Sequence, residues 1–152
     1  MKFLKILLSA MLLMASSLTL ATESIEIVVP EHRDTVNARG FTFVAKAQVE
    51  LDVYPYMVQI VLFNDENGLL QDAYVYPTGT SYSAGPASLE IISPKPSDLD
   101  LDDTTPQKAN AKLPIVVHVR NLIEGDPYYV EVHLWRWPDT AIVGDYVIVQ
   151  TK

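Results

Sequence analysis

The histidines are the first side chains in this sequence to test for chemistry, because imidazole is the commonest metal ligand in proteins. His118 and His133 occupy polar positions of two consecutive predicted strands, and His32 lies in a loop far from both in the sequence. In a hairpin centred on Gly125, His118 and His133 would be diagonal neighbours within reach of one Zn²⁺ or Cu²⁺ ion. In a two-sheet sandwich they would belong to opposite sheets. Two histidines without a clear third ligand make a weak pattern, so we predict no firm metal site.

Four aspartates form the densest acidic cluster and are the candidate ligands for calcium, which prefers several carboxylates on a flexible loop. They are Asp98, Asp100, Asp102 and Asp103. Their spacing imitates the start of an EF-hand loop, but Asp103 stands where that loop requires glycine and Ala109 where it requires a bidentate glutamate. The EF-hand interpretation therefore fails. Two hypotheses remain open, a calcium site of another kind and a solvated acidic loop.

Motifs for catalysis are missing from the sequence. It contains no Gly-x-Ser-x-Gly nucleophile elbow, no His-Glu-x-x-His zinc motif, no glycine-rich phosphate loop and no cysteine. Glycoside hydrolysis needs two carboxylates, but a pair can always be chosen from nineteen acidic residues, so their presence is uninformative. We therefore predict a non-catalytic protein that needs no cofactor.

The first 21 residues have the features of a secretory signal peptide. A positive start with Lys2 and Lys5 precedes an apolar run from Ile6 to Ala15, and a small-x-small site ends at Ala21. Residues 22–152 would then form a mature chain of one-domain length. No later apolar run is long enough to span a bilayer and no lipoprotein cysteine follows, so no membrane anchor is expected. The sequence thus predicts a bacterial periplasmic or secreted protein.

The charge of the mature chain argues against nucleic acids and anionic membrane surfaces as partners. Loss of the signal would leave nine of the eleven basic side chains against nineteen acidic ones, a formal charge of 9 − 19 = −10. Nucleic acids and anionic membrane surfaces are held by lysines and arginines that neutralise phosphate, and the chain has no basic cluster. We therefore predict no binding to nucleic acid.

Short apolar blocks rich in Val, Ile, Tyr and Phe alternate with turn residues along the mature chain. This pattern is typical of an all-β protein, a single antiparallel β-sandwich of about seven to eight strands. The candidate strands are 25–29, 41–51, 56–63, 69–76, 88–92, 113–121, 128–135 and 141–149. Gly68 supplies the positive φ for a hairpin turn at residues 64–68. The proline-rich, acidic stretch 93–112 predicts a long loop.

The run Leu-Ile-Glu-Gly-Asp-Pro-Tyr-Tyr-Val-Glu-Val, which ends at Val132, is the most informative segment. Its leucine six residues before Tyr128, its glycine-containing bend and its alternating valines resemble the junction of the fifth and sixth strands in fibronectin type III and other immunoglobulin-like domains. The opening segment, with Pro30 after the first strand and Phe41 in the second, looks like the start of bacterial Ig-like domains. The resemblance implies an Ig-like sandwich with a tyrosine corner, in which the Tyr128 ring is buried and its hydroxyl bonds to backbone a few residues upstream.

Alternation in two predicted strands leaves one sheet face unusually apolar and aromatic. If Tyr128 and Val130 point inward, as do Val58 and Ile60, then the side chains between them point outward. The outward set contains Met57, Val61, Phe63, Tyr129, His133 and Trp135. A monomeric domain seldom exposes such a patch, so these six are the predicted partner-binding residues. The prediction fails if loop 93–112 covers this face, or if a bulge near Arg136 exchanges the two faces.

Together these features predict a binding, adhesion or assembly module whose partner is another protein or a second copy of the chain. One alternative is a carbohydrate-binding module, in which sugar rings stack on Trp135 or Trp137. Another is a calcium-binding accessory domain centred on the acidic loop.

Overall fold

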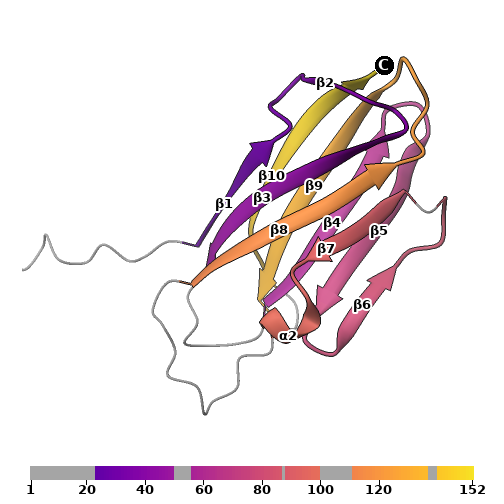
Figure 1. Ribbon diagram of the computed structural model, residues 1–152. Helices are drawn as coiled ribbons and strands as arrows, with labels where there is room; N and C mark the ends of the chain where they lie inside the picture. Colours follow the sequence, from indigo (N-terminus) through magenta and orange to yellow (C-terminus); the bar gives the residue numbers. More distant parts are fainter. Residues whose placement is uncertain (1–22, 50–55, 87, 100–110, 137–139) are drawn as a thin grey trace, which may run out of the picture.

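A computed structural model describes residues 23–49, 56–86, 88–99, 111–136 and 140–152 (Figure 1). Two β-sheets lie face to face, and the described residues also form one short helix, α2 (Pro96–Leu99). The chain is therefore all-β, as its alternating apolar pattern predicts. The signal-peptide prediction falls on residues 1–21, which lie outside the described residues. No helix in the described ranges has the length and apolar character needed to cross a bilayer.

Each sheet combines strands that are distant in sequence. The four-stranded sheet has the order β1-β3-β8-β7, with β1 (Ser24–Val29), β3 (Gly40–Val49), β8 (Ala111–Arg120) and β7 (Leu89–Ser93). The six-stranded sheet has the order β2-β10-β9-β4-β5-β6, with β2 (Thr35–Val36), β10 (Thr140–Thr151), β9 (Pro127–Arg136), β4 (Tyr56–Asn64), β5 (Gly68–Tyr76) and β6 (Gly79–Tyr82). Neighbours are antiparallel except β2, which runs parallel to β10.

All eight predicted strands are present, and their ends in the described ranges differ from the predictions by no more than two residues. The hairpin at residues 64–68 is confirmed, with Gly68 at φ 69° and the Asn64 side-chain oxygen accepting the Asn67 N–H at 2.7 Å. The predicted loop 93–112 needs correction. Helix α2 occupies four of its residues and β8 begins at Ala111, while residues 100–110 lie outside the described ranges.

The alternation pattern does not reveal β2 and β6, which are edge strands of 2 and 4 residues. The side chains of β6 are mostly exposed, so the strand needs no apolar alternation. It is defined instead by main-chain pairing with β5, from Ala73 opposite Tyr82 to Tyr76 opposite Gly79. Strands of this kind depend on a neighbour in space rather than on their own sequence.

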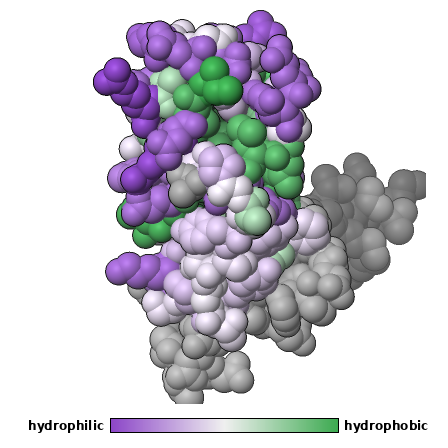
Figure 2. All heavy atoms as spheres, turned by 90° about the vertical axis from the view of Figure 1, so that its right-hand side faces the viewer, coloured by the Kyte–Doolittle hydropathy of each residue, from purple (hydrophilic) through white to green (hydrophobic). Residues whose placement is uncertain are grey.

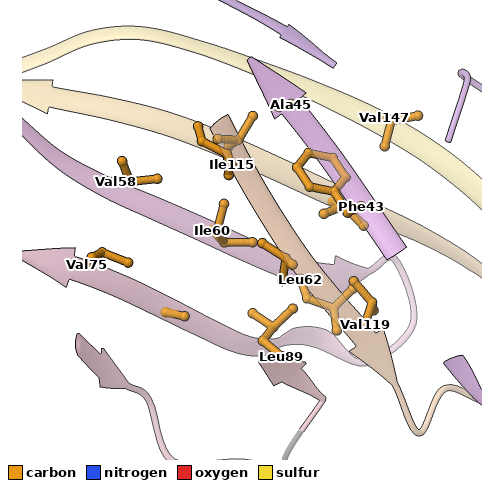
Figure 3. Packing of buried hydrophobic residues seen from close by; sticks show 14 of the residues in the cluster. Phe43, Ala45, Val58, Ile60, Leu62, Val75, Leu89, Ile115, Val119 and Val147 are labelled. Carbon is orange, nitrogen blue, oxygen red and sulfur yellow. The ribbon is translucent and has the colours of Figure 1, made fainter. Parts of the chain in front are cut away.

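Side chains from both sheets meet in one core (Figure 3). Phe43, Ile115 and Val119 come from the four-stranded sheet and Ile60 and Leu62 from the six-stranded sheet, and all five are fully buried. Each such side chain contributes roughly 1.5–3 kcal/mol when removed from water. Packing of this kind stabilises a chain that has no cysteine and hence no disulfide.

Tyr128 forms the predicted corner where β9 begins. Its side chain is 1% exposed, and its hydroxyl accepts a hydrogen bond from the backbone N–H of Ile123 at 2.9 Å. The Thr151 hydroxyl donates to the carbonyl oxygen of Ile123 at 2.6 Å and accepts the N–H of Asp126 at 3.0 Å. These contacts hold the bend around Gly125, which has a φ of 93°, against the end of the six-stranded sheet. The tyrosine-corner contact is therefore confirmed.

Side chains of β5 and β6, in the six-stranded sheet, accept hydrogen bonds from the backbone at and just before β7, in the four-stranded sheet. Gln71, which is 4% exposed, accepts the N–H groups of Ser88 and Leu89 at 3.0 and 2.8 Å. The Tyr82 hydroxyl accepts the N–H of Ile91 at 3.2 Å. Edge groups of β7 are thus occupied, which protects this edge from pairing with another chain. This side faces the reader in Figure 2, where a broad pale area of intermediate hydropathy lies among hydrophilic and apolar patches.

Candidate functional site

The outer face of the six-stranded sheet carries the side chains that the sequence singles out. In β4 and β9 the predicted inward residues are all fully buried: Val58, Ile60, Leu62, Val130, Val132 and Leu134. The register between β4 and β9 is continuous from Tyr56 opposite Arg136 to Phe63 opposite Tyr129. The irregularities of the neighbouring strand pairs lie in β10, between Ala141 and Val143, and at Leu62 and Phe63 in the pairing of β4 with β5. The predicted inward and outward parity is therefore confirmed.

All six predicted contact residues lie on this face, because β4 and β9 are neighbours. Met57 lies opposite Trp135 and Phe63 opposite Tyr129, while Val61 and His133 fall between these two pairs. The six are not equally accessible. Met57 is only 8% exposed, whereas the other five are partly exposed. Met57 therefore offers a partner little surface.

Phe63 and Tyr129 form a stacked pair across the two strands. Their ring centroids are 4.6 Å apart and the ring planes differ by 11°. The Tyr129 hydroxyl donates a hydrogen bond to the Asp65 carboxylate at 3.2 Å, and this contact raises the pKa of Tyr129. Ile148 and Leu69 flank the pair on the adjoining strands, opposite Tyr129 and Phe63 respectively. One flat face of each ring is thus covered by the other ring.

A chain of hydrogen bonds crosses three strands beside this pair. The indole N–H of Trp135 donates to the Gln59 amide oxygen at 3.0 Å, and the Gln59 amide nitrogen donates to the Tyr74 hydroxyl at 2.9 Å. The Tyr74 hydroxyl then donates to the Asp72 carboxylate at 2.6 Å. The Gln59 amide oxygen accepts and its nitrogen donates, which fixes the orientation of the amide, while the Tyr74 hydroxyl both accepts and donates.

The same contacts change two pKa values. The hydrogen bond to Asp72, with burial as a second cause, raises the pKa of Tyr74 to about 12. Burial alone would raise the pKa of Asp72, but hydrogen bonds with Ser83 and Tyr74 hold it below its ordinary value. Asp72 is therefore an anion and Tyr74 a neutral hydrogen-bond donor at physiological pH.

His133 and its neighbours extend the face toward β10. Its Nε2 lies 2.9 Å from the Glu131 carboxylate, and its ring lies over Gly144, where an added Cβ would be 2.5 Å from Nδ1. Tyr146, the next outward residue of β10, is 54% exposed and meets the His32 ring edge to face at 6.0 Å. His32, far away in sequence, therefore lies at the border of the same face.

We define the aromatic face by the outward residues of β10, β9, β4 and β5. They are Val61, Phe63, Tyr74, Tyr129, His133, Trp135 and Tyr146, with the polar Gln59, Asp72 and Glu131. Sequence reasoning missed Asp72, Tyr74 and Tyr146 as members. Alternation within β5 could have identified the first two, because Gln71, Ala73 and Val75 between them are buried. Alternation in β10 is interrupted by the irregularity after Ala141, which obscures Tyr146.

The aromatic face is acidic. Asp72 and Glu131 belong to it, and Asp65 borders it. No lysine or arginine is present among the described outward side chains of β10, β9, β4 and β5. The local potential is therefore negative and attracts cationic groups.

The other candidate residues lie elsewhere. His118 is on the outer face of the four-stranded sheet beside Glu90, so the two strand histidines are on opposite sheets. Within the described ranges, no three His, Asp or Glu side chains are grouped so as to hold a metal ion. Asp98 lies in α2 and accepts the N–H of Lys95 at 2.8 Å. The remaining members of the calcium and sugar predictions, Asp100, Asp102, Asp103 and Trp137, lie outside the described residues.

The aromatic face is the candidate functional site among the described residues. No protein-family model matches this sequence, and no curated protein sequence matches it significantly.

Proposed function

We propose that this chain is an exported, non-catalytic binding module with an immunoglobulin-like sandwich, and that it contacts a partner protein through the aromatic face. The observation that carries the proposal is the fixed arrangement of aromatic side chains over β9, β4 and β5. Stacking orders Phe63 and Tyr129. The hydrogen bonds that run from Trp135 through Gln59 to Tyr74 and Asp72 order Trp135 and Tyr74.

Strand order supports the immunoglobulin-like part of the proposal. The order β1-β3-β8-β7 corresponds to strands A-B-E-D of these domains, and β10-β9-β4-β5-β6 corresponds to G-F-C-C′-C″ of the variable type. The hydrogen bond between Tyr128 and Ile123 has the place of the tyrosine corner near the start of strand F. On this correspondence β2 is an additional strand beside G.

Ordered aromatic rings favour binding energetically. Tyrosine and tryptophan are enriched among the residues that dominate the binding energy of interfaces. Immobilising a flexible side chain on binding costs roughly 0.5–1.5 kcal/mol. Tyr74 and Trp135 are already held by hydrogen bonds, so a partner would lose less of its binding energy to ordering them.

The ring arrangement favours a protein partner over a sugar. A sugar ring stacks on an aromatic ring whose flat face is open. Phe63 and Tyr129 stack on each other, and Tyr74 stacks on Tyr76 with centroids 6.0 Å apart and planes at 16°. In each pair one flat face of each ring is covered by the other ring, and the tyrosines add hydroxyl groups, which suit the mixed surface of a protein.

The charge of the face defines the chemistry of that partner. Carboxylates next to Tyr and Trp rings attract arginine and lysine, both by charge and by cation–π contact. A second copy of the chain would bring the same acidic face and would be repelled. We therefore infer a different protein that presents basic side chains.

Capture from envelope extract tests the proposal. The immobilised chain is compared with a Phe63→Ser, Trp135→Ser double variant and with a matched Val44→Ser, Val116→Ser variant. Val44 and Val116 face each other, partly buried, on the four-stranded sheet. We expect a basic partner to be retained by the wild type and the matched variant, and lost from the first variant. Equal retention by all three chains would contradict the proposal.

A further inference from the structure

A second surface feature lies on the opposite sheet, where a shallow hollow of about 320 Å³ opens at the start of β3 and the end of β8. It is lined by Arg39, Gly40, Thr42, His118 and Arg120, and also by Phe41 and Val119, which pack against or within the core. Thr42, His118 and Arg120 are exposed, so the hollow opens on the outer face of the four-stranded sheet.

Gly40 lines the hollow without contributing a side chain to it. Gly40 pairs with Arg120 and Thr42 pairs with His118, so these residues form two successive cross-strand pairs. An added Cβ at Gly40 would meet only the Val119 carbonyl oxygen at 3.6 Å and the Arg120 Cβ at 3.7 Å, which are ordinary contacts. Its φ is not in the left-handed region, so the backbone does not require glycine here. A larger residue would fold equally well but would fill the space.

Two arginines, Arg39 and Arg120, line this space, although the formal charge of the chain is −8. The Arg120 guanidinium pairs with Glu90, and His118 Nδ1 lies 3.9 Å from the same carboxylate. Within the described part of the chain, the Arg39 guanidinium has no ion-pair partner. One positive charge is thus left uncompensated at the rim of the hollow.

We propose that this hollow binds an anionic sugar of the hexuronate class. The sugar carboxylate would be held by Arg39 and Arg120, whose planar guanidinium groups match its two oxygens. The sugar hydroxyls would bond to Thr42 and His118, which line the hollow and supply both donors and acceptors.

Size and charge favour this ligand over smaller or more highly charged anions. A hollow of about 320 Å³ is in the range of small-molecule pockets and far larger than a single inorganic ion. The Glu90 carboxylate would repel a dianion such as phosphate more strongly than a monoanion. The open shape also admits a sugar that belongs to a longer polysaccharide.

Nuclear magnetic resonance titration of the full chain with glucuronate tests the proposal, with glucose and acetate as matched probes. We expect saturable shifts of the amides of residues 39–42 and 118–120 with glucuronate, and at least tenfold weaker binding of glucose and of acetate. Equal binding of glucose would exclude a role for the charge. Equal binding of acetate would show a carboxylate contact only, and absent or scattered shifts would show no site, so each of these results overturns the proposal.

Variants separate the site from the fold. Gly40→Val should abolish glucuronate binding, and Gly40→Ala should weaken it, with the melting temperature of Gly40→Ala unchanged. Arg39→Gln should weaken binding about tenfold, whereas Arg33→Gln, a change at an exposed arginine near β10, should have no effect. Unchanged binding in Gly40→Ala and Arg39→Gln would overturn the assignment. The aromatic face is untouched by these changes, so this result is independent of the proposed protein partner.

Discussion

The hydroxyl of Tyr128 accepts a hydrogen bond from the backbone N–H of Ile123 at 2.9 Å. Ile123 lies in the connection between β8 and β9, and Tyr128 is the second residue of β9. The ring is fully packed in the core, so this contact, together with those of Thr151, joins the connection to the rigid part of the molecule. In a chain without disulfides, such contacts define where a strand enters its sheet.

Tyr128→Phe should lower the free energy of unfolding by about 1–2 kcal/mol. The variant keeps the buried ring but leaves the Ile123 N–H without its acceptor. Urea unfolding at neutral pH measures the change. Tyr146→Phe is the control, because the Tyr146 side chain is exposed and its hydroxyl has no hydrogen-bond partner among the described residues. Equal stability of Tyr128→Phe and the wild type would show that the corner contact is not stabilising.

Gln71→Ala should lower the free energy of unfolding by about 1–3 kcal/mol. Its side-chain oxygen accepts the buried N–H groups of Ser88 and Leu89. The Ser88 N–H keeps the Pro86 carbonyl oxygen as an acceptor at 2.7 Å, but the Leu89 N–H would be unsatisfied, which costs about 1–3 kcal/mol. Hydrogen exchange should also become faster at these two amides and remain unchanged in β9. Gln71→Glu keeps an acceptor and should lose less stability. Similar exchange rates at Ser88 and Leu89 in Gln71→Ala and wild type would contradict this account of the closed edge.

Stability should fall between about pH 10 and pH 12 because of Tyr74. Its pKa is raised to about 12 in the folded chain, so the unfolded chain loses this proton first as the pH rises. The contribution of the neutral phenol to the free energy of unfolding is therefore fully present below pH 10, and it is lost as the pH rises through about 12, the pKa of Tyr74 in the folded chain. A shift of this size corresponds to about 3 kcal/mol, which solvent screening at a partly exposed site reduces to about 1 kcal/mol.

Tyr74→Phe removes this titration. Urea unfolding of both chains at about pH 8 and about pH 11.5 measures the difference, since the two chains differ only in this hydroxyl. The wild type should lose about 1 kcal/mol more than the variant over this interval. Parallel losses in the two chains would show that the Asp72 contact does not hold the phenol neutral.

Burial in the strands could be predicted from the sequence because strand alternation is a local property. Val58, Ile60 and Leu62 are inward because every second residue of a strand faces the same side. The Tyr128 corner could be predicted from the resemblance of residues 122–132 to immunoglobulin-like domains, and its hydroxyl reaches a residue only five positions away. In both cases the residues concerned lie within one short segment of the sequence.

The polar chain from Trp135 to Asp72 could not be predicted, because it depends on register between three strands. Gln59 reaches Trp135 and Tyr74 only when β4 lies between β9 and β5 in the observed alignment. That alignment includes an irregularity at Leu62 and Phe63, which the sequence does not signal. The role of Gln71 was missed for a similar reason, since its partners belong to a strand in the other sheet.

Site-specific photo-cross-linking in living cells tests the central claim most directly. The photoreactive residue p-benzoylphenylalanine replaces Val61, at the centre of the aromatic face, or Val116, an equally half-buried residue on the opposite sheet. Contact through the aromatic face predicts a discrete cross-linked product with a second protein from Val61→p-benzoylphenylalanine and none from Val116→p-benzoylphenylalanine. A product from the Val116 position alone, or equal products from both, would contradict it.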